Sequence, residues 1–283
     1  MSPANRVIGF IGAGNMAYGL IKGMVSVKPD MEILIYDTDV ERVNFVSGTL
    51  RVNSLNSIGE IVENCDIVFI AVKPFSVESV IGVSVQALNN FKDNNDFPIF
   101  ISIAGGIKVG FMEEVFNRTL KNVSPVKIFR VMPNINSLVG KGMSAMCYNN
   151  YVLNEDIKIA TEIIEMSSKV LVIDEKYFDA VTALSGSGPA YIFLIAEGLI
   201  EAGVKLGLPR DAAKTLVFQT LLGSADLLNS AEFSKTSTKD LRDMVTSPGG
   251  TTAYGLAKLE EGRIKYILDS AVNAAYLRAK GLV

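Results

Sequence analysis

A glycine-rich segment directly follows the first β-branched run of the chain, and its spacing suits the backbone to bind phosphate groups. The segment reads Gly12-Ala13-Gly14-Asn15-Met16-Ala17 and has Ala in the place of the third glycine of a dinucleotide fingerprint. Gly12 permits a tight turn, Gly14 lets a pyrophosphate approach the backbone, and the small Ala17 lets helix and strand pack closely. A helix that begins here would turn its free N–H groups toward the phosphates. We therefore expect a dinucleotide site that includes Gly12, Ala13, Gly14, Asn15 and Met16.

Asp37 ends the second β-branched run, about 20 residues beyond the glycine segment, where a carboxylate can accept hydrogen bonds from the adenosine ribose. A carboxylate at this place repels a 2′-phosphate and favours NADH. Thr38 and Arg42 are close by in sequence, and a guanidinium could instead bind the 2′-phosphate of NADPH. Asp37 could also be a helix cap or a turn residue. The expected cofactor is therefore NADPH or NADH, with Asp37 among its binding residues.

Three later strand ends also carry turn residues or small residues. They read Ala71-Val72-Lys73-Pro74, Ser102-Ile103-Ala104-Gly105-Gly106 and Met132-Pro133-Asn134. Each alone could be an ordinary turn, but the carboxyl ends of parallel strands line the ligand crevice of a doubly wound sheet. We expect a cleft there, with the cofactor bound by Ala71, Val72, Lys73, Pro74, Ala104 and Gly105.

Two motifs in the last third of the chain combine glycines with hydroxyl side chains. The first is Leu184-Ser185-Gly186-Ser187-Gly188-Pro189-Ala190, which allows close approach of another backbone and could hold an anion on free N–H groups. The second is Thr246-Ser247-Pro248-Gly249-Gly250-Thr251-Thr252, which stands before a helical segment and could hold a carboxylate. Plain turns between helices are the alternative for both.

The composition excludes several kinds of catalytic site. The 283 residues include no His and no Trp, and the cysteines are Cys65 and Cys147. A Ser-His-Asp triad, a Cys-His pair, an imidazole metal site and a Cys-rich metal site are therefore impossible, and we expect no metal. Catalysis must use carboxylates, Lys, Tyr, hydroxyls, the backbone or a cofactor. The net charge of −3 argues against a nucleic-acid surface.

The first half of the sequence alternates strand-like and helix-like segments. This order predicts a doubly wound, parallel Rossmann-type sheet with right-handed crossovers. The expected strands are 6–11, 32–36, 67–72, 99–103, 126–131, 143–148 and 170–173, and the expected helices are 16–25, 40–45, 57–63, 76–88, 109–120 and 154–168. Residues 89–96 are polar and are expected to form a surface loop.

After Asp174 the strand pattern stops and long segments of helical periodicity follow. They cover 178–184, 190–206, 210–228, 254–261 and 264–279. The fold class is therefore α/β, with an N-terminal dinucleotide-binding domain over residues 1–173 and an all-α domain over 174–283.

Localisation follows from weaker signals. The longest uninterrupted apolar runs are strand-sized, shorter than the roughly 20 residues of a membrane span. No signal-peptide core is evident in residues 1–6, and the two cysteines lie in apolar stretches typical of buried free thiols. We expect a cytoplasmic protein with no membrane partner.

Taken in order, these motifs resemble those of the pyrroline-5-carboxylate reductases, over essentially the whole chain. The resemblance rests on Gly9-Phe10-Ile11-Gly12-Ala13-Gly14-Asn15-Met16-Ala17, Ala71-Val72-Lys73-Pro74, Arg130-Val131-Met132-Pro133-Asn134, Ala183-Leu184-Ser185-Gly186-Ser187-Gly188-Pro189-Ala190-Tyr191 and Val245-Thr246-Ser247-Pro248-Gly249-Gly250-Thr251-Thr252. The last two motifs are the specific ones. The sequence departs from the family at Ile135-Asn136, where Thr-Pro is common, and at Asp37, where many members carry Ser, Asn or Arg.

The resemblance implies NAD(P)H-dependent reduction of 1-pyrroline-5-carboxylate to L-proline, the last step of proline biosynthesis. It implies that the substrate carboxylate binds to Gly249, Gly250, Thr251 and Thr252, and that Thr252 is the catalytic hydroxyl at the ring nitrogen. It also links Glu175 to the ligand site, and implies a homodimer through the C-terminal domain that assembles further into rings.

Two other functions remain open from the residues. A different two-domain dehydrogenase would use a catalytic Lys at the start of the all-α domain, where Lys176 stands, although the Ser-Gly-Ser-Gly-Pro segment does not fit that pattern. A non-catalytic nucleotide-sensing protein could have the same fold. Loss of the reduced nicotinamide absorbance in the presence of pyrroline-5-carboxylate distinguishes these alternatives.

Overall fold

The computed structural model describes residues 6–91, 97–120 and 126–282, which divide into two compact units. Unit 1 comprises Met1–Ser187 and Tyr276–Val283, and unit 2 comprises Gly188–Ala275. The expected domain boundary at 173/174 lies before the division between these units and stays a prediction. Residues 92–96 of the expected polar loop lie outside the described residues.

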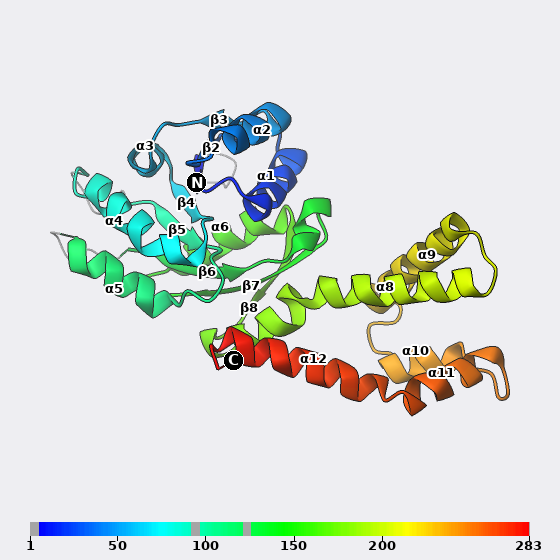
Figure 1. The fold of residues 1–283 in the computed structure, drawn as a ribbon. Helices are drawn as coiled ribbons and strands as arrows, with labels where there is room; N and C mark the ends of the chain where they lie inside the picture. The colour runs from blue at the N-terminus through cyan, green and yellow to red at the C-terminus, as the bar shows by residue number, and fades with distance from the viewer. Residues whose placement is uncertain (1–5, 92–96, 121–125, 283) are drawn as a thin grey trace. The chain divides into compact units, whose positions relative to one another are not determined.

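An eight-stranded sheet forms the centre of unit 1 (Figure 1). Its spatial order is β3-β2-β1-β4-β5-β6-β7-β8, and all neighbouring pairs are parallel except β6 and β7. The strands are β1 (Ile8–Ile11), β2 (Ile33–Tyr36), β3 (Asn53–Ser54), β4 (Ile67–Ile70), β5 (Ile99–Ser102), β6 (Ile128–Met132), β7 (Gly142–Tyr148) and β8 (Ser168–Val172). The doubly wound arrangement predicted from the sequence is therefore confirmed.

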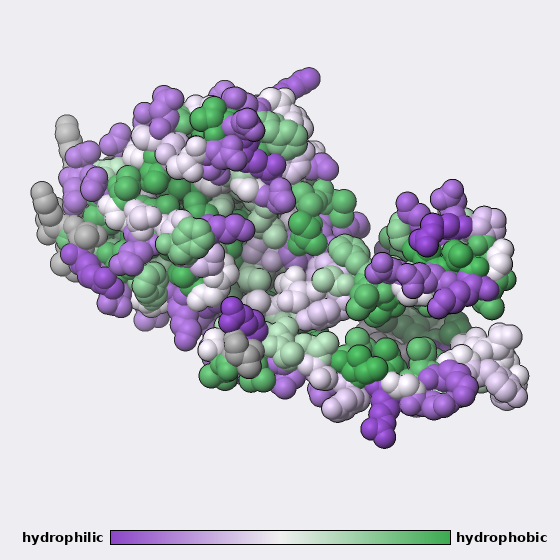
Figure 2. Space-filling view, in the orientation of Figure 1, coloured by the Kyte–Doolittle hydropathy of each residue, from purple (hydrophilic) through white to green (hydrophobic). Residues whose placement is uncertain are grey.

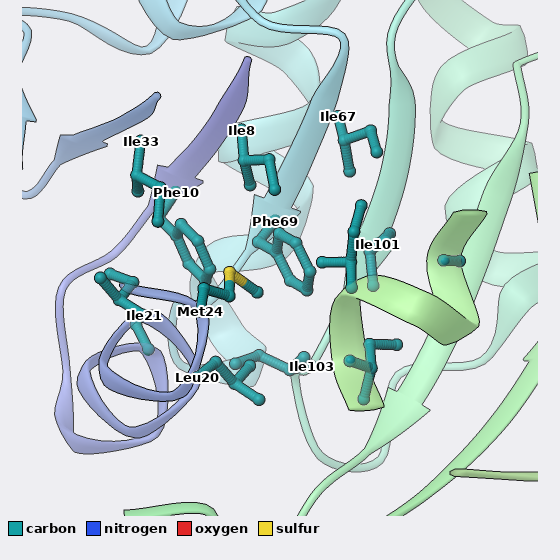
Figure 3. Packing of buried hydrophobic residues seen from close by; sticks show 14 of the residues in the cluster. Ile8, Phe10, Leu20, Ile21, Met24, Ile33, Ile67, Phe69, Ile101 and Ile103 are labelled. Atoms are coloured by element: carbon teal, nitrogen blue, oxygen red, sulfur yellow. The ribbon is translucent and has the colours of Figure 1, made fainter. Parts of the chain in front are cut away.

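The central strands are hydrophobic on both sides because helices cover both faces of the sheet. Phe10 of β1 and Phe69 of β4 stack with their ring centroids 4.5 Å apart, and Leu20 and Met24 pack against the same cluster (Figure 3). The alternate strand residues, such as Ile70, belong to a second cluster on the opposite face. One cluster includes helical residues such as Leu20, Val46 and Ile163, and the other includes Ile61, Ile81 and Phe116.

The helices of unit 1 follow the strands in the order that the sequence predicts. They are α1 (Asn15–Val27), α2 (Val40–Leu50), α3 (Ile58–Asn64), α4 (Val77–Leu88), α5 (Val109–Thr119), α6 (Asn154–Glu165) and α7 (Phe178–Val181). Asp39 caps α2 by accepting a hydrogen bond from the Arg42 N–H, and Ser57 caps α3 through the Glu60 N–H.

Several features of the fold were not expected from the sequence, although β7 itself was predicted as a strand. The two-residue strand β3 is too short to show a period. Strand β7 runs antiparallel to β6, because a short 3₁₀ turn at Ile135–Val139 joins them in place of a crossover helix. The segment Thr182–Gly186, expected as helix and then interruption, forms a π-helical turn in which the Ser187 N–H donates to the Thr182 carbonyl at 2.9 Å.

Unit 2 contains α8 (Gly188–Lys205), α9 (Arg210–Asn229), α10 (Thr238–Met244), α11 (Thr251–Glu261) and most of α12 (Ile264–Ala279). Helices α8 and α9 pack closely, since a Cβ added at Gly203 would lie 3.1 Å from the Ala213 Cβ. The unexpected α10 is short and polar, and a Ser237–Asp240 capping box begins it.

Few side chains of unit 2 are buried within the chain. Among α8 to α12 the buried residues are Pro189, Ala196 and Ala213, whereas Phe193 is 62% exposed. Figure 2 shows hydrophobic side chains on the surface of these helices. An open, mainly apolar groove of about 600 Å³ lies in this unit, lined by Ala190, Phe193, Leu194, Ala196, Glu197, Ile200, Arg210 and Phe218.

One helical run in the described part of the chain is long and apolar enough to span a membrane, although the uninterrupted apolar runs within it are short. Among the described residues, Glu175–Lys205 is long and apolar enough by length and composition, with a mean hydropathy of 1.3 over its most apolar window. Periodic polar residues conceal this length in the sequence, because they divide the apolar residues into short runs. The same exposed apolar helix is what an interface between protein chains requires.

Candidate active site

A cavity of about 670 Å³ lies at the carboxyl ends of the central strands of unit 1. It brings together residues from the glycine segment, the end of β2 and the loops after β4 and β5. The predicted cofactor residues that line it are Gly12, Gly14, Asn15, Met16, Asp37, Ala71, Val72, Lys73, Pro74, Ala104 and Gly105. Thr38, Ser76, Ile103 and Ile135 complete the lining.

The glycine segment has the backbone conformation that its sequence predicts. Gly12 has a φ of +102°, and a Cβ there would lie 2.5 Å from the Ala71 carbonyl oxygen. A side chain at Gly12 would therefore overlap the neighbouring strand end. A Cβ at Gly14 or at Gly105 would meet no atom within 4 Å, so open space lies against the backbone at both glycines. This is the free approach that a dinucleotide phosphate and a flat ring require.

Ala13 does not line the cavity, although it was predicted to bind the cofactor, because its side chain is fully buried. Its two backbone groups are instead bound by side chains that follow β2. The Ala13 N–H donates to Asp37 Oδ2 at 2.7 Å, and Arg42 Nε donates to the Ala13 carbonyl at 2.6 Å. Side chains of the protein therefore bind both the N–H and the carbonyl of Ala13 and stabilise the loop around it.

Asn134, at the end of β6, joins three segments. Its side-chain amide donates to the Ser185 carbonyl at 3.1 Å, and its Oδ1 accepts from the Met143 N–H at 3.1 Å. The sequence identified Met132-Pro133-Asn134 and the Ser-Gly-Ser-Gly motif as separate turns. The structure shows that the buried Asn134 amide connects them. The two residues are 51 positions apart in the sequence, so no local pattern predicts this contact.

Glu175 lies apart from the cofactor cavity. Its Oε1 accepts from Arg130 Nη1 at 2.9 Å and from the Val109 N–H at 2.8 Å. The Arg130 guanidinium is almost fully buried and lies 4.5 Å from the centre of the Phe178 ring. Glu175 lines a different cavity, of about 550 Å³, beside Glu113 and Asp174. Its carboxylate is thus bound by protein donors, and its expected substrate role stays a prediction.

In unit 2, the segment Thr246–Thr252 leads into α11. Gly249 has a φ of +69°, which favours glycine, and Gly250 is the N-cap of α11. No side chain caps this helix, so no side chain accepts a hydrogen bond from the N–H groups of its first turn, which include those of Thr251 and Thr252. The Thr246 hydroxyl donates to the Arg242 carbonyl at 2.7 Å and is occupied. The predicted substrate residues Gly249, Gly250, Thr251 and Thr252 are therefore brought together at a helix N-terminus.

The two thiols are buried and free, as the sequence predicts. Burial raises the pKa of Cys65 to about 12, with the nearby carboxylate of Asp66 adding to the effect. Burial also raises the pKa of Cys147 to about 12, with Glu175 raising it further and Arg130 opposing. Both are neutral thiols at physiological pH. Among the described residues, no group of three or more His, Cys, Asp or Glu could hold a metal ion.

A doubly wound sheet with a glycine loop at its cavity, joined to a largely unburied helical unit, defines a dinucleotide-dependent oxidoreductase that associates through its helices. Two family models match the chain. Residues 175–282 match pyrroline-5-carboxylate reductase dimerisation, and residues 7–104 match NADP oxidoreductase coenzyme F420-dependent.

Comparisons with full-length proteins are consistent with both matches. A pyrroline-5-carboxylate reductase of Arabidopsis thaliana is 37% identical over 280 residues, covering 97% of this chain and 95% of that protein. The structure of Plasmodium falciparum pyrroline carboxylate reductase with NADP bound has a TM-score of 0.82 and 34% identity, covering 99% of this chain and 98% of the other. A pyrroline-5-carboxylate reductase from Coxiella burnetii gives a TM-score of 0.85 at 32% identity, covering 98% of each chain.

The chain belongs to the pyrroline-5-carboxylate reductase family. It is an NAD(P)H-dependent oxidoreductase, a homo-oligomer, and acts on a small molecule.

Proposed function

We propose that this protein reduces the C=N bond of 1-pyrroline-5-carboxylate with NADPH or NADH and releases L-proline. The observation that carries the proposal is the cavity at the strand ends, which brings together residues from five segments, with open space against the backbone of two glycines. Relatives that match over nearly their whole length bear the name of this activity.

The residues of unit 1 fit a nicotinamide dinucleotide. Gly12, Gly14, Asn15 and Met16 would hold the pyrophosphate at the start of α1, and Ala104 and Gly105 leave room for a flat ring. Residues Ala71 to Pro74 follow β4, which lies between β1 and β5 in the sheet. They line the cavity between the glycine segment and the Ala104–Gly105 loop. The bound cofactor would supply the hydride that adds to the carbon of the C=N bond, C2 of the pyrroline ring.

The residues of unit 2 would bind the substrate carboxylate. The N-terminus of α11 offers uncapped N–H groups at Thr251 and Thr252, and the positive end of the helix dipole attracts an anion. Thr252 is half-buried in the first turn of α11. Its hydroxyl would form a hydrogen bond with the ring nitrogen of the substrate. A protonated C=N is already electrophilic, so orientation and a hydroxyl are sufficient and no imidazole is required.

We further propose that Glu175 positions the site and does not touch substrate. Its carboxylate binds the first N–H of α5, the helix that follows the Ala104–Gly106 loop, and it also binds Arg130 of β6. It thereby fixes the start of α5 against the sheet, and with it the loop that lines the cofactor cavity.

The finer assembly and location are also proposals. The exposed apolar residues of α8, α9 and α12 support a homodimer through the helical unit, with dimers assembled into rings. Two free thiols support a reducing compartment, the cytoplasm, and a net charge of −3 supports the absence of nucleic-acid partners.

The test is to mix the purified protein with pyrroline-5-carboxylate and either reduced cofactor, follow the nicotinamide absorbance, and identify proline by mass spectrometry. We expect loss of absorbance with a matching yield of proline. No loss with either cofactor would overturn the proposal.

A variant test addresses Thr252. Thr252→Val removes the hydroxyl and should lower kcat by about tenfold or more, while cofactor affinity stays nearly unchanged. Thr215→Val is the matched control, because the Thr215 hydroxyl donates to the Asp211 carbonyl on exposed α9. Unchanged turnover in Thr252→Val would remove this residue from the mechanism.

A further inference from the structure

The end of β2 carries both a carboxylate and a guanidinium that could decide which cofactor binds. We infer that Asp37 selects a free adenosine 2′-hydroxyl, and hence NADH over NADPH, and that Arg42 is a positioning residue for the glycine loop and not a phosphate ligand. This inference rests on the proposed function, since it concerns the cofactor of the same reaction.

Asp37 has lone pairs left for a ribose. Its Oδ2 accepts from the Ala13 N–H at 2.7 Å, and its Oδ1 accepts from the Asp39 N–H at 3.0 Å. The Thr38 hydroxyl also donates to Oδ1, at 3.5 Å. An ionised carboxylate has about four acceptor positions, so Oδ2 keeps one for a ribose hydroxyl. Both bonds fix the side chain at the cavity wall, where Asp37 and Thr38 stand side by side. A 2′-phosphate at this position would place its charge against a carboxylate that cannot turn away.

Arg42 is already engaged and does not line the cavity. Its Nε donates to the Ala13 carbonyl at 2.6 Å, and its Nη2 donates to the Asn15 Oδ1 at 3.1 Å. The guanidinium also lies over two rings, 5.1 Å from the centre of Phe45 and 5.6 Å from that of Tyr18. To bind a phosphate, Arg42 would have to release the carbonyl that it helps to fix in the glycine loop.

No other cation in the cavity lining is placed to replace it. Lys73 is the cation of the lining, but it follows β4, and the strand order puts β1 between β4 and β2. The other charged groups at the start of α2 are Asp39, which caps that helix, and Glu41 in its first turn. Both are acidic, so neither supplies a cation for a 2′-phosphate.

The first measurement compares kcat/KM for NADH and NADPH in the unaltered protein. We expect NADH to be preferred by about tenfold or more, the size that one unfavourable charge contact gives. A preference for NADPH would overturn the inference. If neither cofactor supports turnover, the proposed function fails, and titration of nicotinamide fluorescence still tests whether NADH binds more tightly than NADPH.

The second measurement uses the isosteric variant Asp37→Asn. Its side-chain oxygen can still accept from the Ala13 N–H, whereas its NH2 group cannot accept from the Asp39 N–H. The bond to the glycine loop is therefore retained while the charge is removed. We expect the NADH-to-NADPH ratio of kcat/KM to fall by about tenfold, mainly through a lower KM for NADPH. Asp39→Asn is the matched control, because Asp39 also accepts a backbone hydrogen bond, from the Arg42 N–H, but lies outside the cavity lining. The ratio should stay within about twofold there.

The third measurement separates the two roles of Arg42. Arg42→Ala and Arg42→Lys should raise KM for both cofactors by a similar factor, because the loop loses its clamp, and the ratio should hardly change. Selective loss of NADPH in either variant would show that the guanidinium binds the phosphate, and would overturn the inference. The ratio within one protein sample is independent of how much of that variant is folded.

Discussion

The two units of this protein differ in where their hydrophobic side chains are buried. In unit 1 the four residues of β1 and of β4 are all buried, and Phe10, Phe69 and Phe100 are completely enclosed. In unit 2 the long helices α8 and α9 leave Phe193 and Phe218 half or more exposed. Unit 1 therefore has its own core, whereas unit 2 can complete a core only against another surface. Unit 1, which has its own core, contains the cofactor cavity, and unit 2, whose apolar side chains are exposed, is the unit through which the protein associates.

The largest expected effect is on association. Phe193→Asp places a charge in the exposed apolar groove of unit 2 and should convert the oligomer to monomer, because an unpaired charge cannot be buried in an interface. Analytical ultracentrifugation measures the change. Leu153→Asp is the control, since Leu153 is 61% exposed at the N-cap of α6 in unit 1, where Asp suits the cap. An oligomer retained in Phe193→Asp would contradict the contrast between the units.

The next effect is on the core of unit 1. Phe69→Ala removes a fully buried ring stacked on Phe10 and should lower the free energy of unfolding by about 3 to 5 kcal/mol. Urea denaturation at several protein concentrations measures it. A loss of unfolding free energy that arises in unit 1 should not depend on protein concentration. A loss that arises from weaker association through unit 2 should depend on it. A concentration-dependent loss in Phe69→Ala would show that the core of unit 1 is not self-sufficient.

Cofactor binding can be reduced without disturbing that core. Gly14→Val should raise the cofactor KM by about tenfold or more, because its side chain would fill the space the pyrophosphate requires. Stability should be nearly retained, since a Cβ at Gly14 meets no atom within 4 Å. Thermal unfolding without cofactor is the check. Undiminished cofactor affinity would place the pyrophosphate elsewhere.

A smaller effect is expected at the buried ion pair. Glu175→Gln retains an acceptor for the Val109 N–H but leaves the Arg130 charge without its counterion, so stability should fall by about 1 to 2 kcal/mol. If Glu175 positions the loop, kcat should fall while the KM for pyrroline-5-carboxylate stays nearly constant. A large rise in that KM would instead favour direct contact with substrate.

The smallest effect at neutral pH concerns the thiols. Cys65 and Cys147 have their pKa raised to about 12 from an ordinary value of 9.0, so the folded protein binds these protons more tightly than the unfolded chain. Their contribution to stability is complete below pH 9 and is lost as the pH rises toward 12. A thiol-reactive chromophore should label neither cysteine in the native protein at neutral pH and both in denaturant. Rapid native labelling would contradict their burial.

The sequence predicted the parts of the fold that repeat and missed those that depend on distant partners. The alternation of β-branched runs and helical periods was enough for β1, β2, β4, β5 and β6 and for the helices between them. The strand β7 was predicted, but its antiparallel direction was missed, because its run looks like any other strand and only the short connection distinguishes it. Helix α10 was missed because its capping box precedes few apolar residues.

The candidate site shows the same division. The glycine segment and the strand ends could be found because their chemistry is local: a tight turn, a close approach, a helix start. The bond from Asn134 to Ser185 and the ion pair of Arg130 with Glu175 could not be found, because each joins residues more than 40 positions apart. For Glu175 the charge was visible in the sequence, but its partners were not.

The two hydrogen bonds that Asp37 and Arg42 make to the backbone of Ala13 limit how this loop could be transferred to another protein. Its N–H and its carbonyl are bound by side chains 24 and 29 residues further along the chain. A graft of Gly12 to Ala17 alone would therefore lose its shape in a new host. The smallest transferable module runs from β1 through the first turn of α2, with the glycines and their two clamps inherited together.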